Sequence, residues 1–358
     1  MVDSRRRAIS WTGIGRYVAA LHRHLPAALG EERPAFVSGG GLHVIRDGTA
    51  TPKDVMKRTR KVLWEQVALP FWLSRHRPSF LHLPWYEGPL TPQCPLIVTI
   101  HDLDTLIHPT RYSVLFRAYY NELLLRYARL ATRILVCSET TARDVDEHLQ
   151  AGSKTVVIPQ GIDPEFRTPD SDRGRALLRE LGVPTNKPVV VSGAGTGIRK
   201  NLPILGTALE RLALGNLAVT LVLTQTSRIP ESLAPAALAG LGVVPAGVLS
   251  TSDLAALYAV SDISLCPSLY EGFGFAVLES MAAGCPVICS NSGSHPEIAG
   301  GAALLFDPRN AGELADHIRV LLGDRGLASR LRTEGYLRAK AFDWRLTIER
   351  TAQAYRAA

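Results

Sequence analysis

The stretch ISLCPSLYEGFGFAVLESMAAGCPVICS, residues 263–290, contains the pattern that decides the fold. The apolar run Ile263–Cys266 predicts a buried strand, and Val287–Ser290 predicts a second one. Between them, Phe275–Ala283 predicts a helix that ends at Gly284, because glycine readily adopts the left-handed conformation that closes a helix. A helix that joins two short apolar strands is typical of parallel sheets, so the pattern predicts an α/β protein.

The same alternation extends on both sides of this stretch. Further strands are predicted at Ala35–Val37, Phe80–Leu83, Leu96–Ile100, Ile134–Cys137, Thr155–Ile158, Val189–Ser192 and Val219–Leu223. Helices are predicted at Arg16–Leu25, where Pro26 would end the helix, and at Arg117–Ala131, Thr140–Leu149, Leu202–Leu212, Asp253–Ala259, Ala311–Leu322, Leu327–Ala341 and Trp344–Ala357. We therefore expect two Rossmann-like, doubly wound domains in tandem, joined near residues 159–184 and binding ligand in a cleft at the carboxyl ends of their strands.

Composition narrows the class of protein. The 358 residues carry a formal charge of +7, but the basic residues are dispersed and carry no aromatic-basic recognition motif, so we expect no nucleic-acid partner. We find neither the run of about 18 apolar residues that a membrane helix needs nor an apolar segment after the charged N-terminus that would indicate secretion. Five cysteines without Cys-x-x-Cys spacing indicate neither a zinc site nor a disulfide framework, and we expect a cytoplasmic protein.

The glycine loop before the helix at Phe275 suits a phosphorylated sugar. Gly272 and Gly274 allow successive backbone amides to turn toward one point, and a helix N-terminus adds partial positive charge. Glu271 on the loop and Glu279 one turn into the helix are acceptors for the paired hydroxyl groups of a sugar or a ribose. Taken alone, the string is equally compatible with a glycine-rich turn and two surface glutamates.

The complete string Glu-Gly-Phe-Gly-x-x-x-x-Glu, followed by Ser-Met-Ala-Ala-Gly-x-Pro-Val, resembles the signature of the retaining GT-B glycosyltransferases of family four. Other stretches resemble motifs of that family in the same order: Gly13-Ile-Gly15-Arg-Tyr17, Thr99-Ile-His101-Asp-Leu103, Ser138-Glu-Thr-Thr141, Val157-Ile-Pro-Gln-Gly-Ile-Asp163, Arg199-Lys200-Asn201 and Phe342-Asp-Trp344. The resemblance covers nearly the whole chain. It implies a first domain of residues 1–168 plus 344–358, to which the C-terminal helix returns, and a second domain of residues 169–343.

The resemblance also implies roles for individual residues. His101 and Glu271 are the implied catalytic residues, with His101 stabilising positive charge on the reacting sugar and Glu271 holding its hydroxyl groups. The implied donor-binding residues are Gly13, Gly15, Arg199, Lys200, Gly272, Phe273, Gly274, Phe275, Ala276, Val277 and Glu279. Lys200 and Arg199 would neutralise the diphosphate, Glu279 would hold the ribose, and the amides of residues 275–277 would face the phosphates. Outside the family context, His101 would be interpreted as a core histidine.

The implied reaction is a transfer of a hexosyl group with retention of configuration, without a metal ion or another cofactor. Since Glu271 would bind sugar hydroxyl groups from the side, a front-face substitution fits better than a covalent intermediate. Mannosyl donors are common among relatives with the Gly13–Tyr17 motif, so GDP-mannose is the first donor to consider, while uridine and thymidine sugars remain open. The acceptor is a glycan, a lipid carrier or a secondary metabolite. A nucleotide-sugar epimerase of the same GT-B architecture is the alternative.

Residues 53–72 allow two interpretations. Five cations between Lys53 and Lys61, followed by Trp64, Phe71 and Trp72, are compatible with a helix that rests peripherally on the inner, anionic face of a membrane. An ordinary helix with one solvated face and one core face has the same pattern and is favoured. The aromatic residues of the segment from His82 to Gly88 are compatible either with stacking on an acceptor sugar or with a place in the core.

Overall fold

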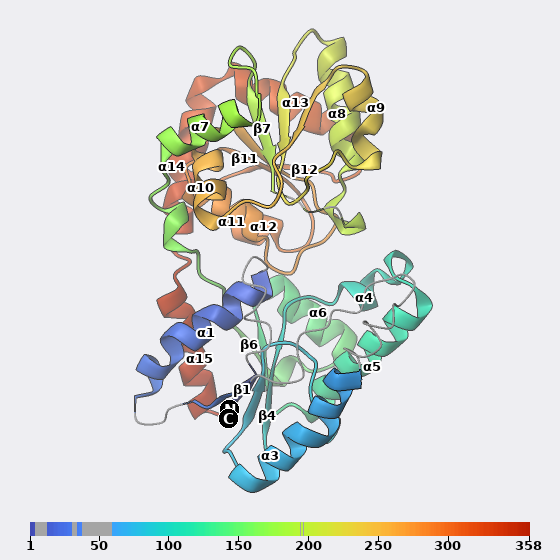
Figure 1. Ribbon diagram of the computed structural model, residues 1–358, viewed down its shortest axis with the longest axis vertical. Helices are drawn as coiled ribbons and strands as arrows, with labels where there is room; N and C mark the ends of the chain where they lie inside the picture. The colour runs from blue at the N-terminus through green and yellow to red at the C-terminus, as the bar shows by residue number, and fades with distance from the viewer. Residues whose placement is uncertain (4–12, 31–33, 38–58, 194, 196) are drawn as a thin grey trace. The chain divides into compact units, whose positions relative to one another are not determined.

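The structure is a computed structural model that describes residues 1–3, 13–30, 34–37, 59–193, 195 and 197–358 (Figure 1). It divides the chain into two compact units, one formed by Met1–Gly161 with Trp344–Ala358 and one formed by Ile162–Asp343. Each unit contains one parallel sheet with helices on its faces, which confirms the expected pair of Rossmann-like α/β domains. Residues 53–58 of the basic stretch lie outside the described residues.

The sheet of the first unit has six parallel strands in the order β2-β1-β3-β4-β5-β6. The strands are β1 Val2–Asp3, β2 Phe36–Val37, β3 Leu81–Leu83, β4 Leu96–Ile100, β5 Arg133–Val136 and β6 Thr155–Val157. All five residues of β4 are buried, as expected for a central strand covered on both faces. The strand order reverses between β1 and β3, and this switch point is where open α/β sheets bind their ligands.

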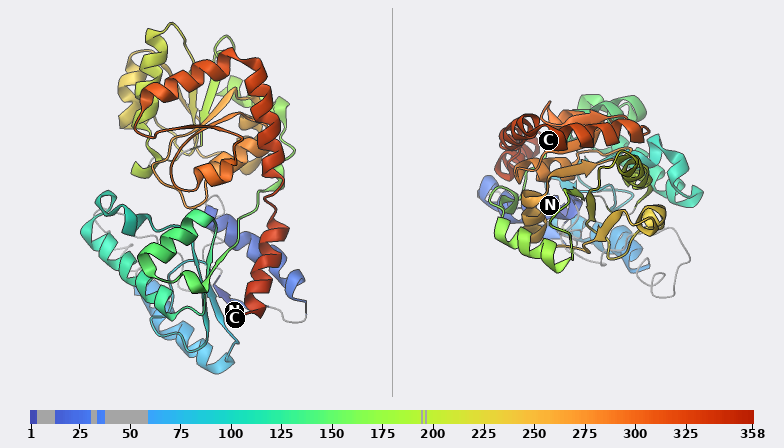
Figure 2. Two further views of the ribbon diagram at one scale, coloured as in Figure 1. Left: turned by 180° about the vertical axis from the view of Figure 1, so that it is seen from behind. Right: turned by 90° about the horizontal axis from the view of Figure 1, so that it is seen from above.

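The helices of the first unit are α1 Gly13–Leu29, α3 Leu69–His76, α4 Asp104–Ile107, α5 Val114–Leu130, α6 Glu139–Leu149 and α15 Trp344–Arg356, with a π-helix η2 at Trp64–Ala68 and 3-10 turns η3 Pro109–Arg111 and η4 Gly152–Lys154. Ser138 caps α6, since its Oγ accepts a hydrogen bond of 3.0 Å from the Thr141 amide. Helix α15 lies beside α1 (Figures 1 and 2), and Arg356 Nη2 donates to Ala28 O at 3.0 Å.

The predicted end of the first helix at Pro26 is wrong. Helix α1 continues through Pro26 to Leu29. A proline inside a helix removes one hydrogen bond and costs about 3 kcal/mol. Leu25 and Leu29 are both buried on the same side of α1, and the apolar area that they remove from water offsets this cost.

The second unit has the sheet order β12-β11-β10-β7-β8-β9, again with all neighbours parallel. The strands are β7 Val189–Ser192, β8 Thr220–Leu223, β9 Gly242–Pro245, β10 Ile263–Cys266, β11 Val287–Ser290 and β12 Leu304–Phe306. The order reverses between β7 and β10. The two strands that the sequence pattern missed, β9 and β12, are the two edges of the sheet, where short strands and a proline such as Pro245 are tolerated.

The helices of the second unit are α7 Ser171–Glu180, α8 Pro203–Leu214, α9 Ala234–Leu238, α10 Thr251–Val260, α11 Phe275–Ala282, α12 His295–Ala299, α13 Ala311–Gly323 and α14 Arg325–Ala339, with 3-10 turns η5 Pro164–Phe166, η6 Ile198–Lys200 and η7 Glu231–Leu233. They cover both faces of the sheet (Figures 1 and 2). On one face, α8 and α13 pack over the strands through a continuous apolar cluster that includes Leu205, Leu209, Leu314 and Ile318.

Most of the segment 159–184, which was expected to connect the domains, lies in the second unit, from Ile162 onward. Helix α7 packs against α10 so closely that a Cβ atom at Gly174 would lie 2.2 Å from the carbonyl oxygen of Ala256. Phe166 is fully buried, and the Ile162 amide donates to Phe342 O at 3.3 Å. Residues 162–168, which the sequence assigned to the first domain, therefore lie in the second unit.

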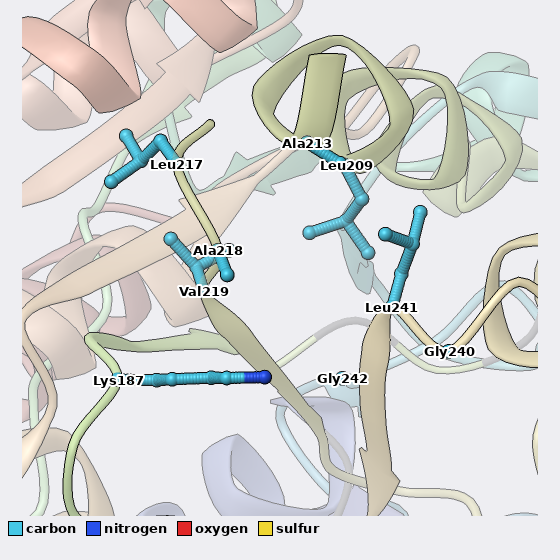
Figure 3. A pocket seen from close by; sticks show the side chains of 9 residues that line it. All are labelled: Lys187, Leu209, Ala213, Leu217, Ala218, Val219, Gly240, Leu241 and Gly242. Carbon is cyan, nitrogen blue, oxygen red and sulfur yellow. The ribbon is translucent and has the colours of Figure 1, made fainter. Parts of the chain in front are cut away.

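One small cavity of about 30 Å³ lies inside the second unit (Figure 3). It is lined by Leu209 and Ala213 of α8 and by residues at the amino ends of β8 and β9, among them Val219 and Gly242. A space of this size holds about one water molecule. The cavity lies at the amino-terminal ends of the strands, whereas the glycine loop follows a carboxyl-terminal strand end. The cavity is therefore not part of the candidate site.

Candidate functional site

The predicted donor residues of the second unit gather at the carboxyl ends of β7 and β10. Arg199 and Lys200 follow β7 in the turn η6, and Glu271 follows β10 in the loop before α11. Strands β7 and β10 are neighbours in the sheet, and the strand order reverses between them. The loops thus meet at the point where doubly wound sheets bind their ligands.

Glu271 is the centre of an ion-pair cluster. Its Oε1 atom lies 2.5 Å from Lys200 Nζ and accepts a hydrogen bond of 2.9 Å from Ser268 Oγ. Its Oε2 atom lies 3.9 Å from Arg199 Nη2. Burial alone would raise the pKa of Glu271, but Lys200 and then Arg199 outweigh burial and hold the pKa well below its usual range. Glu271 is therefore a carboxylate, which accepts hydrogen bonds and does not act as an acid.

Asn201 fixes the turn that carries the two cations. It adopts the left-handed conformation with φ at 55°, which asparagine tolerates better than most residues. Its Nδ2 donates to Pro267 O at 3.1 Å and to Pro308 O at 2.7 Å, and the Leu269 amide donates to Arg199 O at 2.7 Å. These bonds attach the turn η6 to the loop after β10, so Lys200 and Glu271 are held together by the backbone as well as by charge.

The glycine loop leads directly into helix α11. Gly274 is the N-cap of the helix with φ at 87°, a value that side-chain-bearing residues rarely adopt. The Phe273 ring packs edge-on against Phe275 and Phe342, with centroids 5.1 and 5.9 Å away, so its side chain is a packing group. The expected role of Gly272, Phe273 and Gly274 in sugar binding would therefore be carried by backbone amides.

Of the three amides at the start of α11 that were predicted to face the phosphates, one is engaged within the helix. The amide of Val277 donates to Gly274 O at 3.1 Å. The third residue of a helix can make such a tight bond to the N-cap carbonyl. The amides of Phe275 and Ala276 remain as the candidates for an anion at this helix terminus.

Glu279 lies on α11 one turn beyond the loop and is almost completely buried. Its charge acts on the thiol of Cys266, the last residue of β10, together with the charges of Lys200 and Glu271. Burial raises the pKa of this thiol to about 12, with smaller effects from the three charged groups. Lys200 and Glu271 contact each other directly, and Glu279 lies in the helix that their loop leads into.

His295 was not among the predicted site residues. It is the first residue of α12 and is buried, with Cδ2 of its ring only 2.8 Å from the position that a Cβ atom on Gly274 would occupy. The preceding residue, Ser294, donates to the carbonyl oxygen of Glu271 at 3.0 Å through both its amide and its Oγ. No motif in the sequence pointed to His295, because only the fold brings the loop after β11 onto the loop after β10.

In the first unit, both ring nitrogens of His101 are engaged. Nε2 lies 2.9 Å from Pro84 O and must donate to it, since a carbonyl oxygen only accepts. Nδ1 then accepts from Gln160 Nε2 at 3.0 Å. The Tyr17 and Trp85 rings pack against the imidazole at 5.4 and 6.0 Å. These are the contacts of a packed core histidine, and a role for the ring in catalysis would require exchange of one of these hydrogen bonds.

The other predicted residues of the first unit are Gly13 and Gly15. Both lie in the first turn of α1 rather than in a loop, and Gly15 is buried. These residues are helical because the residues that follow bury a regular apolar face that includes Val18, Leu21 and Leu25. Residues 4–12, which lie directly before Gly13, are outside the described part of the chain.

The first unit also contains a buried charge network, formed by Lys61, Glu65 and Glu87, that the sequence did not indicate. Lys61 Nζ is 2.9 Å from Glu87 Oε1, which also accepts from Tyr120 OH at 3.1 Å. Glu65 lies 4.0 Å from Lys61 on the same helical segment. The three charged side chains are almost fully buried. The segment from His82 to Gly88 is thus anchored in the core, which favours the packing interpretation of its aromatic residues.

Residues 59–76 present an apolar stripe to solvent. Leu63, Val67 and Phe71 are 55%, 60% and 68% exposed. Arg60 and Arg75, one turn beyond each end of the stripe, are also exposed, while the acidic Glu65 points into the core. In the described residues, no helix combines the length and the apolar character needed to cross a membrane.

Comparisons with known proteins describe both units. Residues 11–166 match the family Glycosyltransferase Family 4, and residues 176–338 match the family Glycosyl transferases group 1. An O-antigen chain mannosyltransferase B of Escherichia coli is 38% identical over 110 residues, which are 31% of this chain and 29% of that protein. An MMP alpha-(1->4)-mannosyltransferase of Mycolicibacterium hassiacum is 27% identical over 279 residues, 73% of this chain and 65% of that protein. The chain thus spans less than two thirds of the length of these two curated relatives.

The solved structures show the same fold. Anabaena HepE in complex with UDP is 18% identical, with a TM-score of 0.71, and the superposition covers 100% of this chain and 99% of that chain. The two families, the relatives and this structure give no support to the epimerase alternative.

Proposed function

This chain belongs to the glycosyltransferases of family 4 and group 1, and we propose that it transfers a hexosyl group from a nucleotide-diphosphate sugar to a hydroxyl group of an acceptor. The observation that carries the proposal is the cluster of Lys200, Arg199 and Glu271 beside the N-terminus of α11, at the switch point of the second sheet. Two cations, two amides at a helix terminus and a carboxylate are the groups that a diphosphate and a sugar require.

Lys200 and Arg199 would act on the leaving group. Negative charge on the diphosphate grows as its bond to the anomeric carbon breaks, so cations fixed in advance lower the barrier. Asn201 holds the turn with both cations in place through its bonds to Pro267 and Pro308. The diphosphate would share these cations with Glu271. We propose that this protein charge suffices and that no metal ion is needed.

The transfer would retain the configuration of the anomeric carbon. In the proposed front-face step, the bond from the anomeric carbon to the phosphate oxygen breaks, and the bond to the acceptor oxygen forms on the same face. The acceptor proton passes to the departing phosphate oxygen, which leaves as nucleoside diphosphate. Glu271 would not be the nucleophile in this step. Its Oε1 atom is engaged by Lys200 and Ser268, and Arg199 lies 3.9 Å from its Oε2 atom, so the carboxylate is positioned to hold hydroxyl groups.

GDP-mannose is the donor that we propose first. The support is that the two relatives described above are named mannosyltransferases. The acceptor would be a glycan, a lipid-linked saccharide or a secondary metabolite, and the name of the first relative, an O-antigen chain enzyme, favours a growing glycan chain.

The test is a thermal-shift panel of UDP, GDP and dTDP in the presence of EDTA. A ligand at about 100 times its dissociation constant stabilises the folded state by about 2.7 kcal/mol, so one nucleotide should raise the melting temperature clearly. Lys200→Met should remove this shift. Lys187→Met, at the amino-terminal end of the strands and away from the site, should keep it. Absence of a shift with all three nucleotides would contradict the proposal. Formation of free sugar isomers from nucleotide sugar alone would favour an epimerase.

We also propose that the stripe of Leu63, Val67 and Phe71 docks on an anionic membrane surface. Support comes from the exposed arginines at both of its ends and from the inward direction of Glu65, which leaves the exposed face basic. Each such cation contributes about 1 kcal/mol near an anionic leaflet. Replacing the three apolar residues with glutamine should abolish co-sedimentation with phosphatidylglycerol vesicles. Leu214→Gln, at an 85% exposed leucine of the second unit, is the control, and equal sedimentation of both variants would refute the docking.

A further inference from the structure

His295 is held in one orientation by a hydrogen bond that also fixes its tautomer. Ser290 Oγ donates its only hydrogen to Ser268 O at 2.6 Å. The same Oγ lies 2.9 Å from His295 Nδ1, so it must accept there, and Nδ1 carries the ring proton. In the neutral imidazole, Nε2 is then an acceptor with an available lone pair. Among the described residues, Nε2 has no hydrogen-bond partner.

The position of this lone pair is set by the glycine loop. A Cβ atom on Gly274 would lie 2.8 Å from Cδ2 and 3.4 Å from Nε2 of His295, so the ring edge that carries Nε2 faces the N-cap of α11. The loop after β11 also approaches the loop after β10 at Gly293, where a Cβ atom would lie 2.6 Å from Glu271 O. The loops after β10 and β11 therefore pack closely together, and Nε2 lies beside Gly274, one of the residues expected to hold the sugar.

The imidazole is neutral in this environment. Burial lowers the pKa of His295 to about 4, although the charge of Glu271 opposes the shift. A neutral ring with its proton on Nδ1 accepts a hydrogen bond and cannot donate one from Nε2. Its natural partner in a nucleotide sugar is a hydroxyl group, because the phosphate oxygens are acceptors themselves.

We propose that His295 is a further donor-site residue, whose Nε2 accepts a hydrogen bond from a hydroxyl group of the transferred sugar. The inference rests on the proposed function of the same site. It assigns the recognition of the sugar to two acceptors of different kinds, the carboxylate of Glu271 and the imidazole of His295. A donor that lacks the hydroxyl group facing His295 would leave Nε2 buried without a partner and would be bound less well.

The test compares two substitutions of His295. In His295→Asn the amide nitrogen can replace Nδ1 as the donor to Ser290, but nothing replaces Nε2. In His295→Gln the longer side chain can place an acceptor oxygen where Nε2 was. His317→Gln is the matched control, because His317 lies on α13 in the same unit and bonds only to Leu305 O among the described carbonyl groups.

Calorimetry would measure the dissociation constants of UDP-glucose, GDP-mannose and dTDP-glucose, and of the corresponding free diphosphates. Loss of one neutral hydrogen bond should weaken binding of the nucleotide sugar about fivefold in His295→Asn, with unchanged binding of the free diphosphate. His295→Gln and His317→Gln should bind both ligands within about twofold of the wild type. Equal losses for sugar nucleotide and free diphosphate in His295→Asn, together with a lowered melting temperature, would assign His295 a structural role and overturn the inference.

Nitrogen NMR of histidine-labelled wild-type protein provides a measurement that needs no stable Asn variant. The Nε2 resonance of His295, identified by its disappearance in His295→Gln, should have the shift of an unprotonated nitrogen. It should move on addition of the nucleotide sugar and stay unchanged with the free diphosphate; the same response to both would refute the inference. If the wild type binds the free diphosphates and no nucleotide sugar, the inference fails while the nucleotide site stands. If it binds neither class, the proposed function itself fails.

Discussion

Replacing Lys200 with methionine tests two contributions of the lysine charge, one to the stability of the fold and one to catalysis. The melting temperature measures the first and the turnover number measures the second. The substitution keeps an unbranched side chain of similar length and removes the ammonium group from its place 2.5 Å from Glu271. Arg199, at 3.9 Å, is then the nearest cation to Glu271 among the described residues. Coulomb energy falls with the inverse of distance. The attraction between Lys200 and Glu271, which the substitution removes, is therefore about 1.6 times the attraction between Arg199 and Glu271, which remains.

The expected loss of stability follows from the burial of the pair. Removing one partner of a fully buried ion pair costs about 3–5 kcal/mol. The side chains of Lys200 and Glu271 are 24% and 12% exposed, so water screens part of the interaction, and we expect about 2 kcal/mol. For a unit of this size the melting temperature should fall by about 4–8 °C. The turnover number should fall about 100-fold or more, because the leaving group loses a fixed cation.

The pH dependence identifies Glu271 as the group responsible. In the wild type, the folded-state pKa of Glu271 lies below its ordinary value of 4.5, so the carboxylate contributes stability above that pH and loses it as the pH falls. In Lys200→Met, the largest charge that opposes burial is absent, so the folded-state pKa of Glu271 rises, although Arg199 still opposes burial. The difference in melting temperature between variant and wild type should therefore shrink as the pH falls toward and below 4.5, because Glu271 of the variant takes up a proton at a higher pH than Glu271 of the wild type.

Differential scanning calorimetry across this pH range measures the effect, with Lys187→Met as the control. The double variant Lys200→Met/Glu271→Gln should recover most of the lost stability but none of the lost activity, because it removes the uncompensated charge without restoring the cation. A melting-temperature difference that is constant with pH, or a double variant no more stable than Lys200→Met, would refute the reasoning.

Three further changes test other parts of the structure. Gly293→Ala should lower the melting temperature by several degrees, because its Cβ atom would lie 2.6 Å from Glu271 O at a residue with φ at 56°; alanine at Gly323, which has nothing within 4 Å, is the comparison, and equal effects would contradict the account. Glu271→Ala should reduce turnover about 100-fold or more without a glycosyl-enzyme adduct in mass spectra, and detection of an adduct would rule out the front-face step. Pro26→Ala should raise the melting temperature of the first unit, since alanine restores the missing hydrogen bond in α1; a lower value would show that the proline ring contributes packing that compensates for this bond.

Much of the fold was predictable because its signals are local. Runs such as Leu96–Ile100 and Val287–Ser290 are mostly apolar, are buried throughout, and begin and end as the sequence pattern predicts. Edge strands carry weaker signals: β9 contains a glycine and a proline, and two of the three residues of β12 are only partly buried. The helix end predicted at Pro26 was wrong because burial of residues such as Leu29, which the longer helix allows, outweighs the low helix propensity of proline.

The candidate site was predictable where its residues lie next to one another in the sequence. Glu271, Gly272 and Gly274 form a single motif, and Lys200 follows a recognisable strand. His295 was missed, and Asn201 was quoted only as part of a motif without its positioning role, because both roles depend on which loops the sheet brings together. A sequence pattern carries no such information. The charge network of Lys61 and Glu87 was missed for a further reason, since an isolated lysine on a basic stretch gives no sign of being buried.

The membership of α15 in the first unit has a consequence for the order in which the two units form. Tyr355 OH bonds to His82 Nδ1 at 2.6 Å, and Thr347 Oγ1 donates to Pro159 O at 2.8 Å, so residues 344–358 complete the interior built by residues 1–161. A ribosome produces this helix only after the whole of residues 162–343. The second unit, residues 162–343, can therefore reach its native state first. Until α15 has been synthesised, the first unit is incomplete, and the surfaces of His82 and α1 that α15 covers are accessible to solvent or to chaperones.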